Sequence, residues 1–120
     1  MAASAHIQRF STNSEGRTEY FINVIYLGSQ WAIRKCFSDF SHFNSVLKSR
    51  ELTIPVDLPE KSWWNKFNPD FLNQRKKTLQ AYLNTLLQNV ELDNSLLKEF
   101  LEVDENMLII ARSKHERDSR

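Results

Sequence analysis

Basic residues that could hold an anion stand at a predicted strand-to-helix junction. Residues 31 to 37 alternate as a strand does, with Trp31 and Ile33 on one side and Arg34 and Cys36 on the other. A helix is predicted from Ser38, a good N-cap residue, because apolar side chains then recur at helical spacing. A cation at such a corner is suited to bind a phosphate or a carboxylate.

Arg75 is the most informative single residue. It lies four residues after Phe71 and four before Leu79, so a helix that buries its apolar stripe turns Arg75 toward the core or its rim. A guanidinium left there without an anion costs roughly several kcal/mol. We expect a negative group beside it, which is either an internal carboxylate, Asp39 or Asp57, or a ligand phosphate or carboxylate held bidentately.

The proline-containing loop after the first predicted helix carries Lys61, Trp63, Trp64, Lys66 and Phe67. Adjacent indoles point in different directions in an extended chain, so they are not both expected in one core. An exposed indole flanked by lysines suits a bilayer interface, where each lysine near anionic lipid contributes about 1 kcal/mol. The alternative is that one indole packs on the core and the other covers it.

Length and composition indicate one soluble globular domain. The chain has 120 residues, of which 41% are hydrophobic and 26% charged. One cysteine excludes an internal disulfide and a thiolate zinc site, and it favours a cytoplasmic location. No apolar run approaches the roughly 20 residues that cross a bilayer, so any membrane association is expected to be peripheral.

The charge distribution favours one local anion site. Residues 30 to 80 carry nine Lys or Arg against five Asp or Glu, a net +4, whereas residues 81 to 106 carry one Lys against six acids, a net −5. A nucleic-acid-binding domain is usually basic throughout, so no nucleic acid partner is expected. A merely solvated charged surface is the alternative.

No catalytic arrangement is predicted. Cys36 forms no recognisable signature with His6, His42 or His115, and a lone cysteine on a strand is more often a small buried hydrophobe. The sequence has no glycine-rich phosphate loop and no His-Glu metal spacing. We therefore expect no enzyme activity, no cofactor and no metal.

The order of strands before helices predicts an α+β fold. It consists of a three-stranded antiparallel β-meander, followed by a helical subdomain of three to four helices with a proline-rich loop. Strands are predicted over residues 6–12, 19–27 and 30–37, and helices over residues 38–48, 70–89 and from 93 or 94 onward. Residues 1–5 are expected to be disordered and residues 113–120 to form a polar tail.

Several stretches together resemble a phox-homology (PX) domain, the phosphoinositide-binding module of sorting nexins. They are Lys-Cys-Phe-Ser-Asp-Phe at 35–40, Leu-Pro-Glu-Lys at 58–61, Asp-Phe-Leu-Asn-Gln-Arg-Lys at 70–76 and Leu-Leu-Lys-Glu-Phe-Leu at 96–101. Each stretch is a weak signal alone, but their order and spacing together are specific. The resemblance covers residues 6–112 and implies the same α+β fold.

The resemblance also implies roles for individual residues. Phe37 falls on the aromatic that stacks on the inositol ring, Lys61 on the lysine near the 1-phosphate, and Arg75 on the arginine for the 4- and 5-hydroxyls. The arginine that grips the 3-phosphate in this family falls on Cys36, which has neither a charge nor a bidentate fork. Arg34, about 6.6 Å back along the same strand face, is the predicted substitute.

Trp63, Trp64 and Phe67 match the membrane-inserting loop of the family. The implied function is a membrane-targeting module in endosomal or vacuolar protein transport, peripheral on those membranes. Phosphatidylinositol 3-phosphate is the lipid that the resemblance favours. The alternative is a PX-fold module that has lost lipid binding and contacts a protein partner.

Overall fold

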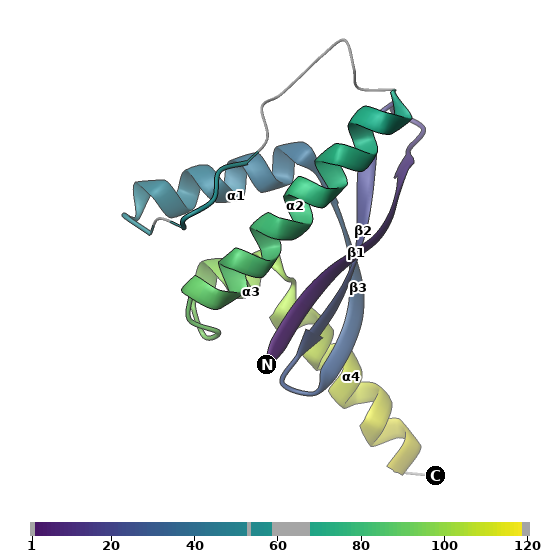
Figure 1. The fold of residues 1–120 in the computed structure, drawn as a ribbon. Helices are drawn as coiled ribbons and strands as arrows, with labels where there is room; N and C mark the ends of the chain where they lie inside the picture. The colour runs from purple at the N-terminus through teal and green to yellow at the C-terminus, as the bar shows by residue number, and fades with distance from the viewer. Residues whose placement is uncertain (1, 53, 59–67, 119–120) are drawn as a thin grey trace.

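A computed structural model describes residues 2–52, 54–58 and 68–118. In chain order the elements are β1 (Ala3–Thr12), β2 (Thr18–Tyr26), β3 (Ser29–Cys36), α1 (Phe37–Ser49), α2 (Pro69–Asn89), α3 (Ser95–Phe100) and α4 (Val103–Asp118). The three strands form one sheet with α1, α2 and α3 gathered on one side of it, while α4 projects away toward the C-terminus (Figure 1).

The sheet is an antiparallel meander in the order β1-β2-β3. Leu27 and Gly28 join β2 to β3 with φ values of 47° and 87°, the conformation of a two-residue turn that matches strand twist. This turn sets a register in which Ile22 pairs with Ile33 and Glu19 with Cys36. The predicted α+β meander is therefore confirmed.

Side chains from the inner face of the sheet and from the helices form one core. Ile22 and Val24 of β2 are fully buried, and they belong to the same hydrophobic cluster as buried side chains of every helix. The helical members with no exposed surface are Phe40, Leu47, Leu79, Tyr82, Leu83, Leu86 and Leu97. Burying these side chains from water is what holds the helices on one face of the sheet.

The long helix α2 begins and ends close to the predicted residues. The side chain of Asn68 accepts hydrogen bonds from the backbone N–H groups of Asp70 at 2.9 Å and Phe71 at 3.2 Å, while Pro69 occupies the first turn. The predicted inward turn of Arg75 is confirmed, because only 8% of this residue is exposed.

The predicted starts of the first strand and of the first helix are wrong, and the predicted polar tail is helical over most of its length. β1 begins at Ala3 instead of residue 6, because Ala3 and Ala5 are buried in the core, so disorder over residues 1–5 does not fit the described part of that stretch. α4 extends to Asp118, so most of the predicted polar tail is helical, although its side chains are exposed. The N-cap of α1 is Cys36 instead of Ser38, since the Asp39 carboxylate accepts a hydrogen bond from the Cys36 N–H at 2.7 Å.

A side chain of α2 binds the backbone of β1. The Gln80 Oε1 accepts a hydrogen bond from the Ile7 N–H at 2.7 Å, and the Gln80 Nε2 donates to the Ala5 carbonyl at 2.9 Å. Lys76, one turn earlier, donates to the Gln8 carbonyl at 3.4 Å. These contacts fix the helix along the strand and therefore set the position of Arg75.

Replacing Gln80 with alanine should destabilise the fold. Two hydrogen bonds to β1 are lost, so we expect the free energy of unfolding to fall by about 1 to 3 kcal/mol in urea denaturation. Gln88, exposed on the same helix, is the matched control, and its replacement by alanine should change stability by less than about 0.5 kcal/mol. Equal effects of the two substitutions would contradict a structural role for the Gln80 amide.

Candidate functional site

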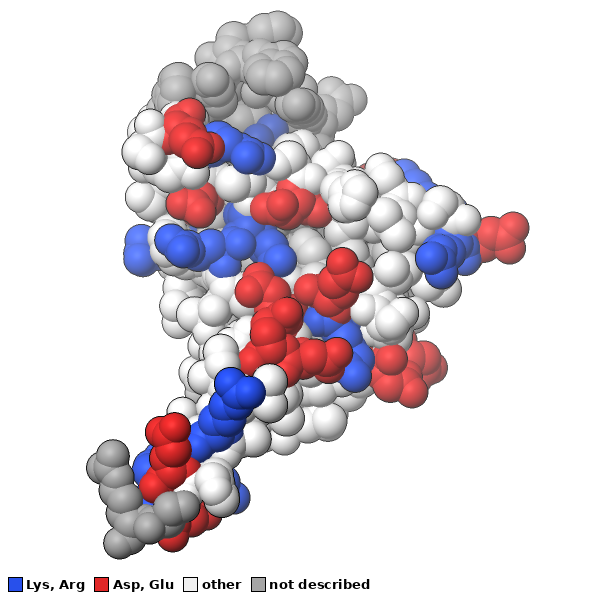
Figure 2. Space-filling model, turned by 180° about the vertical axis from the view of Figure 1, so that it is seen from behind, with Lys and Arg blue, Asp and Glu red and all other residues white. Residues whose placement is uncertain are grey.

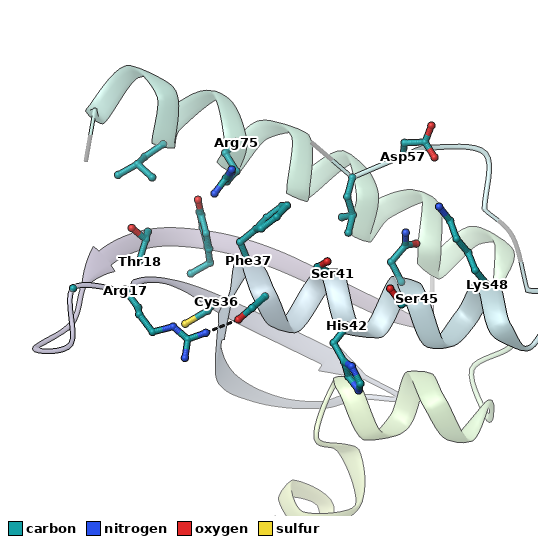
Figure 3. A pocket seen from close by; sticks show the side chains of 16 residues that line it. Arg17, Thr18, Cys36, Phe37, Ser41, His42, Ser45, Lys48, Asp57 and Arg75 are labelled. Atoms are coloured by element: carbon teal, nitrogen blue, oxygen red, sulfur yellow. Dashed lines mark hydrogen bonds between the residues drawn. The ribbon is translucent and has the colours of Figure 1, made fainter. Parts of the chain in front are cut away.

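A cavity of about 920 Å³ opens between the turn joining β1 to β2, the end of β3, and helices α1 and α2 (Figure 3). Its lining is Gly16, Arg17, Thr18, Tyr20, Cys36, Phe37, Ser38, Ser41, His42, Asn44, Ser45, Lys48, Asp57, Leu58, Leu72 and Arg75. This volume lies in the range of sites that bind small molecules. The lining contains more basic than acidic side chains, which suits an anionic ligand.

Arg75 forms one wall of the cavity. Its guanidinium carbon lies 4.1 Å from the centre of the Phe37 ring and 4.6 Å from that of the Phe71 ring, close enough for cation–π attraction. Burial lowers the pKa of Arg75 from its usual range, and the nearby Tyr20 hydroxyl partly offsets that shift. Because the starting pKa is so high, the guanidinium stays charged at neutral pH.

Asp39 and Asp57, the two predicted internal partners of Arg75, form no ion pair with it within the described ranges. Asp39 accepts the hydrogen bond from the Cys36 N–H at the start of α1. Asp57 is exposed on the cavity wall, toward the end where Lys48 lies (Figure 3). Asp39 therefore caps α1 outside the cavity lining, Asp57 lines the far end of the cavity, and Arg75 contacts two aromatic rings.

Phe37, Cys36 and Tyr20 line the cavity beside Arg75. Burial raises the pKa of the Cys36 thiol, an effect that the charge of Arg17 opposes and that of Asp39 reinforces. Burial raises the pKa of Tyr20 to about 12, although the charge of Arg75 acts in the opposite direction. At neutral pH this wall therefore offers an uncharged thiol and an uncharged phenol beside a charged guanidinium.

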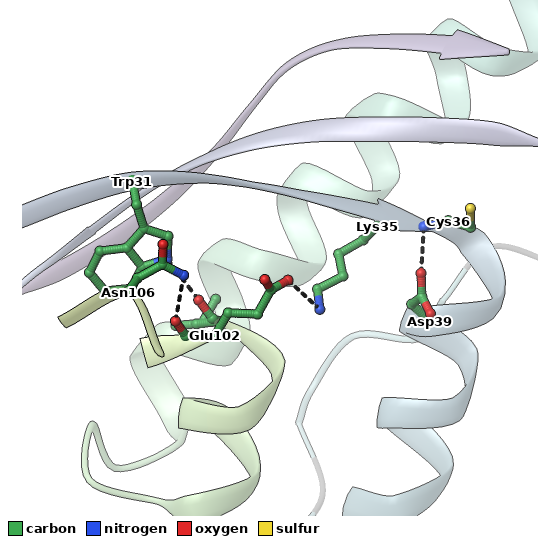
Figure 4. A network of polar contacts seen from close by, with 7 residues as sticks. Trp31, Lys35, Cys36, Asp39, Glu102 and Asn106 are labelled. Carbon is green, nitrogen blue, oxygen red and sulfur yellow. Dashed lines mark hydrogen bonds and ion pairs between the residues drawn. The ribbon is translucent and has the colours of Figure 1, made fainter. Parts of the chain in front are cut away.

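Lys35 points away from the cavity. Its Nζ lies 3.1 Å from the Glu102 carboxylate and 4.9 Å from the centre of the Phe100 ring, whereas the Cys36 Sγ lies on the other side of the strand (Figure 4). Trp31, on the same side as Lys35, donates to the Leu101 carbonyl at 2.9 Å. This side of β3 is therefore used to dock the junction of α3 and α4.

Arg34 does not line the cavity. It pairs in register with Phe21 on the outer face of the sheet, where the Arg9 guanidinium carbon lies 3.7 Å from the centre of the Phe21 ring. The predicted reach of Arg34 to the cavity does not fit this placement, because Cys36 is the residue of β3 that lines the cavity and Arg34 does not line it. Phe37, Cys36 and Arg75 are the predicted site residues that the described structure brings together.

The other predicted site residues lie outside the described part of the chain. They are Lys61, Trp63, Trp64 and Phe67.

Sequence reasoning missed Arg17, whose guanidinium Nη2 donates a hydrogen bond to the Ser38 hydroxyl at the start of α1. The signal that could have revealed it is the register of the meander. Glu19 pairs with Cys36, and extending the same register by two residues places Arg17 opposite Ser38.

The charged surface is mixed outside the cavity. On the face seen in Figure 2, acidic side chains gather near the centre, above the projecting helix, with basic side chains around them. Within the described ranges, no cluster of three or more His, Cys, Asp or Glu could hold a metal ion. No helix in the same ranges has the length and apolarity needed to span a bilayer.

Comparison with known proteins agrees with this arrangement. A family model described as the PX domain matches residues 24–104. The PX domain-containing protein kinase-like protein of Rattus norvegicus is 36% identical over 96 residues, which are 77% of this chain and 16% of that protein. Sorting nexin-16 of Homo sapiens is 35% identical over 77 residues, which are 62% of this chain and 22% of that protein.

A solved structure has the same fold. The X-ray structure of a designed CISK-PX domain superposes with a TM-score of 0.73 at 26% sequence identity, covering 81% of this chain and 96% of that one. The chain thus spans less than a quarter of the two curated relatives named above and nearly all of an isolated PX domain. Since the family model matches more than half of its residues, this chain belongs to the PX domain family, whose members generally bind phosphoinositides and membranes and are generally non-enzymatic.

Proposed function

We propose that this chain is a membrane-targeting module that binds a phosphoinositide headgroup in the cavity between the sheet, α1 and α2. The observation that carries the proposal is Arg75, a buried guanidinium held against two aromatic rings at the cavity wall. A fixed, charged donor with a planar fork is suited to bind vicinal hydroxyls or phosphate oxygens.

In this proposal the inositol ring lies against Phe37, and Arg75 donates to the 4- and 5-hydroxyls. The Arg75 guanidinium already covers one face of the Phe37 ring at 4.1 Å, so the sugar uses the remaining face and edge of that ring. Lys61 binds near the 1-phosphate. The proposed lipid is phosphatidylinositol 3-phosphate, which would direct the protein to endosomal or vacuolar membranes in protein transport.

The loop that contains Trp63, Trp64 and Phe67 is proposed to insert into the bilayer interface. Indole rings favour the headgroup level of a membrane, and Lys61 and Lys66 beside them would contact anionic lipid. Two weak contacts, headgroup binding and loop insertion, would together hold the domain on the surface more firmly than either alone.

Replacing Arg75 with glutamine should abolish recognition of the lipid. Losing one charged partner of a desolvated contact removes roughly 2 to 5 kcal/mol, so binding to vesicles that contain phosphatidylinositol 3-phosphate should weaken by about 30-fold or more. Vesicle sedimentation measures the change, and circular dichroism checks the fold. Arg9→Gln is the matched control, because Arg9 also stacks on a phenylalanine but on the outer face of the sheet.

Replacing both Trp63 and Trp64 with alanine should weaken binding to vesicles by about tenfold or more, because two large aromatic surfaces can no longer leave water. Binding of soluble inositol 1,3-bisphosphate, measured by calorimetry, should stay unchanged. A loss of both activities would place the indoles in the headgroup site or the core. If the wild-type protein binds none of the seven phosphoinositides, the protein-interaction alternative replaces this proposal.

A further inference from the structure

The cavity has a second arginine, Arg17, on the side opposite to α2. It follows the turn between β1 and β2 and approaches the cavity from there, whereas Arg75 approaches from α2 (Figure 3). Arg17 is exposed to solvent, in contrast to the buried Arg75. The two arginines thus line the same cavity from two separate elements.

The turn holds Arg17 in place before any ligand arrives. The Asn13 Oδ1 accepts a hydrogen bond from the Arg17 N–H at 3.0 Å, and the Asn13 N–H donates to the Arg17 carbonyl at 2.8 Å. Gly16, with a φ of 78°, adopts the left-handed conformation that closes this turn. The side chain is in turn fixed by its hydrogen bond to the Ser38 hydroxyl. Little conformational freedom therefore remains to be lost on binding.

The hydrogen bond to Ser38 leaves the charge of Arg17 available. A hydroxyl oxygen does not neutralise a guanidinium, which has four further N–H donors. Among the residues that the structure describes, no carboxylate lies within ion-pair distance of Arg17. Ser38 still has its own O–H to donate, since its oxygen serves as the acceptor. The pair therefore presents a positive charge and several donors to the cavity.

Tyr20 adds an independent indication of a ligand. Tyr20 lines the cavity, only 1% of this residue is exposed, and its hydroxyl has no hydrogen-bond partner within the described ranges. Arg75 and Cys36, which both influence the pKa of this hydroxyl, line the same cavity as Tyr20. A buried hydroxyl without a partner is unfavourable, and an oxygen-rich ligand in the cavity would supply an acceptor.

Because position 36 is a cysteine, β3 supplies no positive charge to the cavity, and a phosphate there would need a cation from another element. β3 ends in a thiol on the cavity side, while Lys35 is engaged with Glu102 on the other side of the strand. Arg17 lines the same cavity as Cys36, and its positive charge lowers the pKa of the Cys36 thiol against the effect of burial. Arg17 is thus placed to supply the positive charge that an arginine at position 36 would supply in other members of the family.

We propose that Arg17 and Ser38, together with the Tyr20 hydroxyl, form a phosphate subsite that receives the phosphate monoester of the bound headgroup. This inference rests on the proposed function and adds to it the residues that distinguish a phosphorylated inositol from an unphosphorylated one. The monoester lies at the Arg17 side of the cavity, and the ring hydroxyls lie at the Arg75 side.

The test compares Arg17→Gln with the wild-type protein on phosphatidylcholine vesicles that contain about 5% phosphatidylinositol 3-phosphate, which keeps the bulk negative charge of the surface low. We expect affinity to fall by about tenfold or more, because a charge-assisted contact to phosphate is lost. Arg50→Gln, on an exposed arginine outside the cavity lining, is the control for bulk charge. Calorimetry with soluble inositol 1,3-bisphosphate measures headgroup binding without a membrane. The wild-type protein and Arg50→Gln should bind this ligand with similar affinity, and Arg17→Gln should bind it more weakly.

A second substitution makes the test specific to the subsite. In the Arg17→Gln background, Cys36→Arg should restore much of the lost affinity, because it returns a guanidinium to the same part of the cavity. Thermal unfolding checks that Arg17→Gln leaves the turn folded. Should that variant be unstable, Tyr20→Phe, which removes only the hydroxyl, is expected to weaken binding of the bisphosphate about threefold or more.

The outcomes separate this inference from the proposed function. If Arg75→Gln abolishes binding while Arg17→Gln binds like the wild type, the function stands and the Arg17 subsite is wrong. If Arg34→Gln abolishes binding and Arg17→Gln does not, the Arg17 subsite is also wrong. Binding of the soluble bisphosphate without vesicle binding keeps the subsite and rejects the membrane role. If the wild-type protein binds neither, both ideas fail.

Discussion

The site depends on a guanidinium that is held out of water between two aromatic rings. Arg75 lies against Phe37, which begins α1, and against Phe71, one turn earlier on its own helix. A charge in this setting attracts anions more strongly than the same charge in bulk water, because less solvent screens it. The rings also fix the direction of the fork. The same contact therefore joins α2 to α1 and aims the charge into the cavity.

The register of the meander determines which other residues meet Arg75. A tight turn at Leu27 and Gly28 pairs Glu19 with Cys36, so the turn between β1 and β2 lies beside the start of α1. Alternation along β3 then sends neighbouring side chains to opposite sides. Lys35 joins the core side through Glu102, while Cys36 faces the cavity. Two adjacent residues thus face the helical core and the cavity separately.

Much of this arrangement could be predicted from local patterns. The inward turn of Arg75 follows from the apolar stripe around it, and the α+β order follows from strands that precede helices. The family resemblance named Phe37, Cys36 and Arg75, which the structure brings to one cavity. The first two predictions are confirmed because each depends on residues that are close in sequence or on the overall order of elements. The binding roles of Phe37, Cys36 and Arg75 stay predictions.

The failures came from tertiary contacts. Ala3 and Ala5 have weak strand preference, but burial against the core extends β1 to include them. Ser38 is a better N-cap by type than Cys36, but the Asp39 carboxylate supplies the cap from inside the helix. The importance of Arg17 depends on strand pairing across the sheet, and such pairing is not visible in a local window.

The contact between Gln80 and β1 also limits how this domain can associate. Its side-chain amide bonds the outward N–H of Ile7 and the outward carbonyl of Ala5, as one peptide group of a fourth strand would. An unpaired strand edge is a template on which another chain can add in β-augmentation or in aggregation. Here Gln80 of α2 already bonds these two backbone groups of β1. An incoming peptide would have to displace α2 before it could pair with this part of the strand.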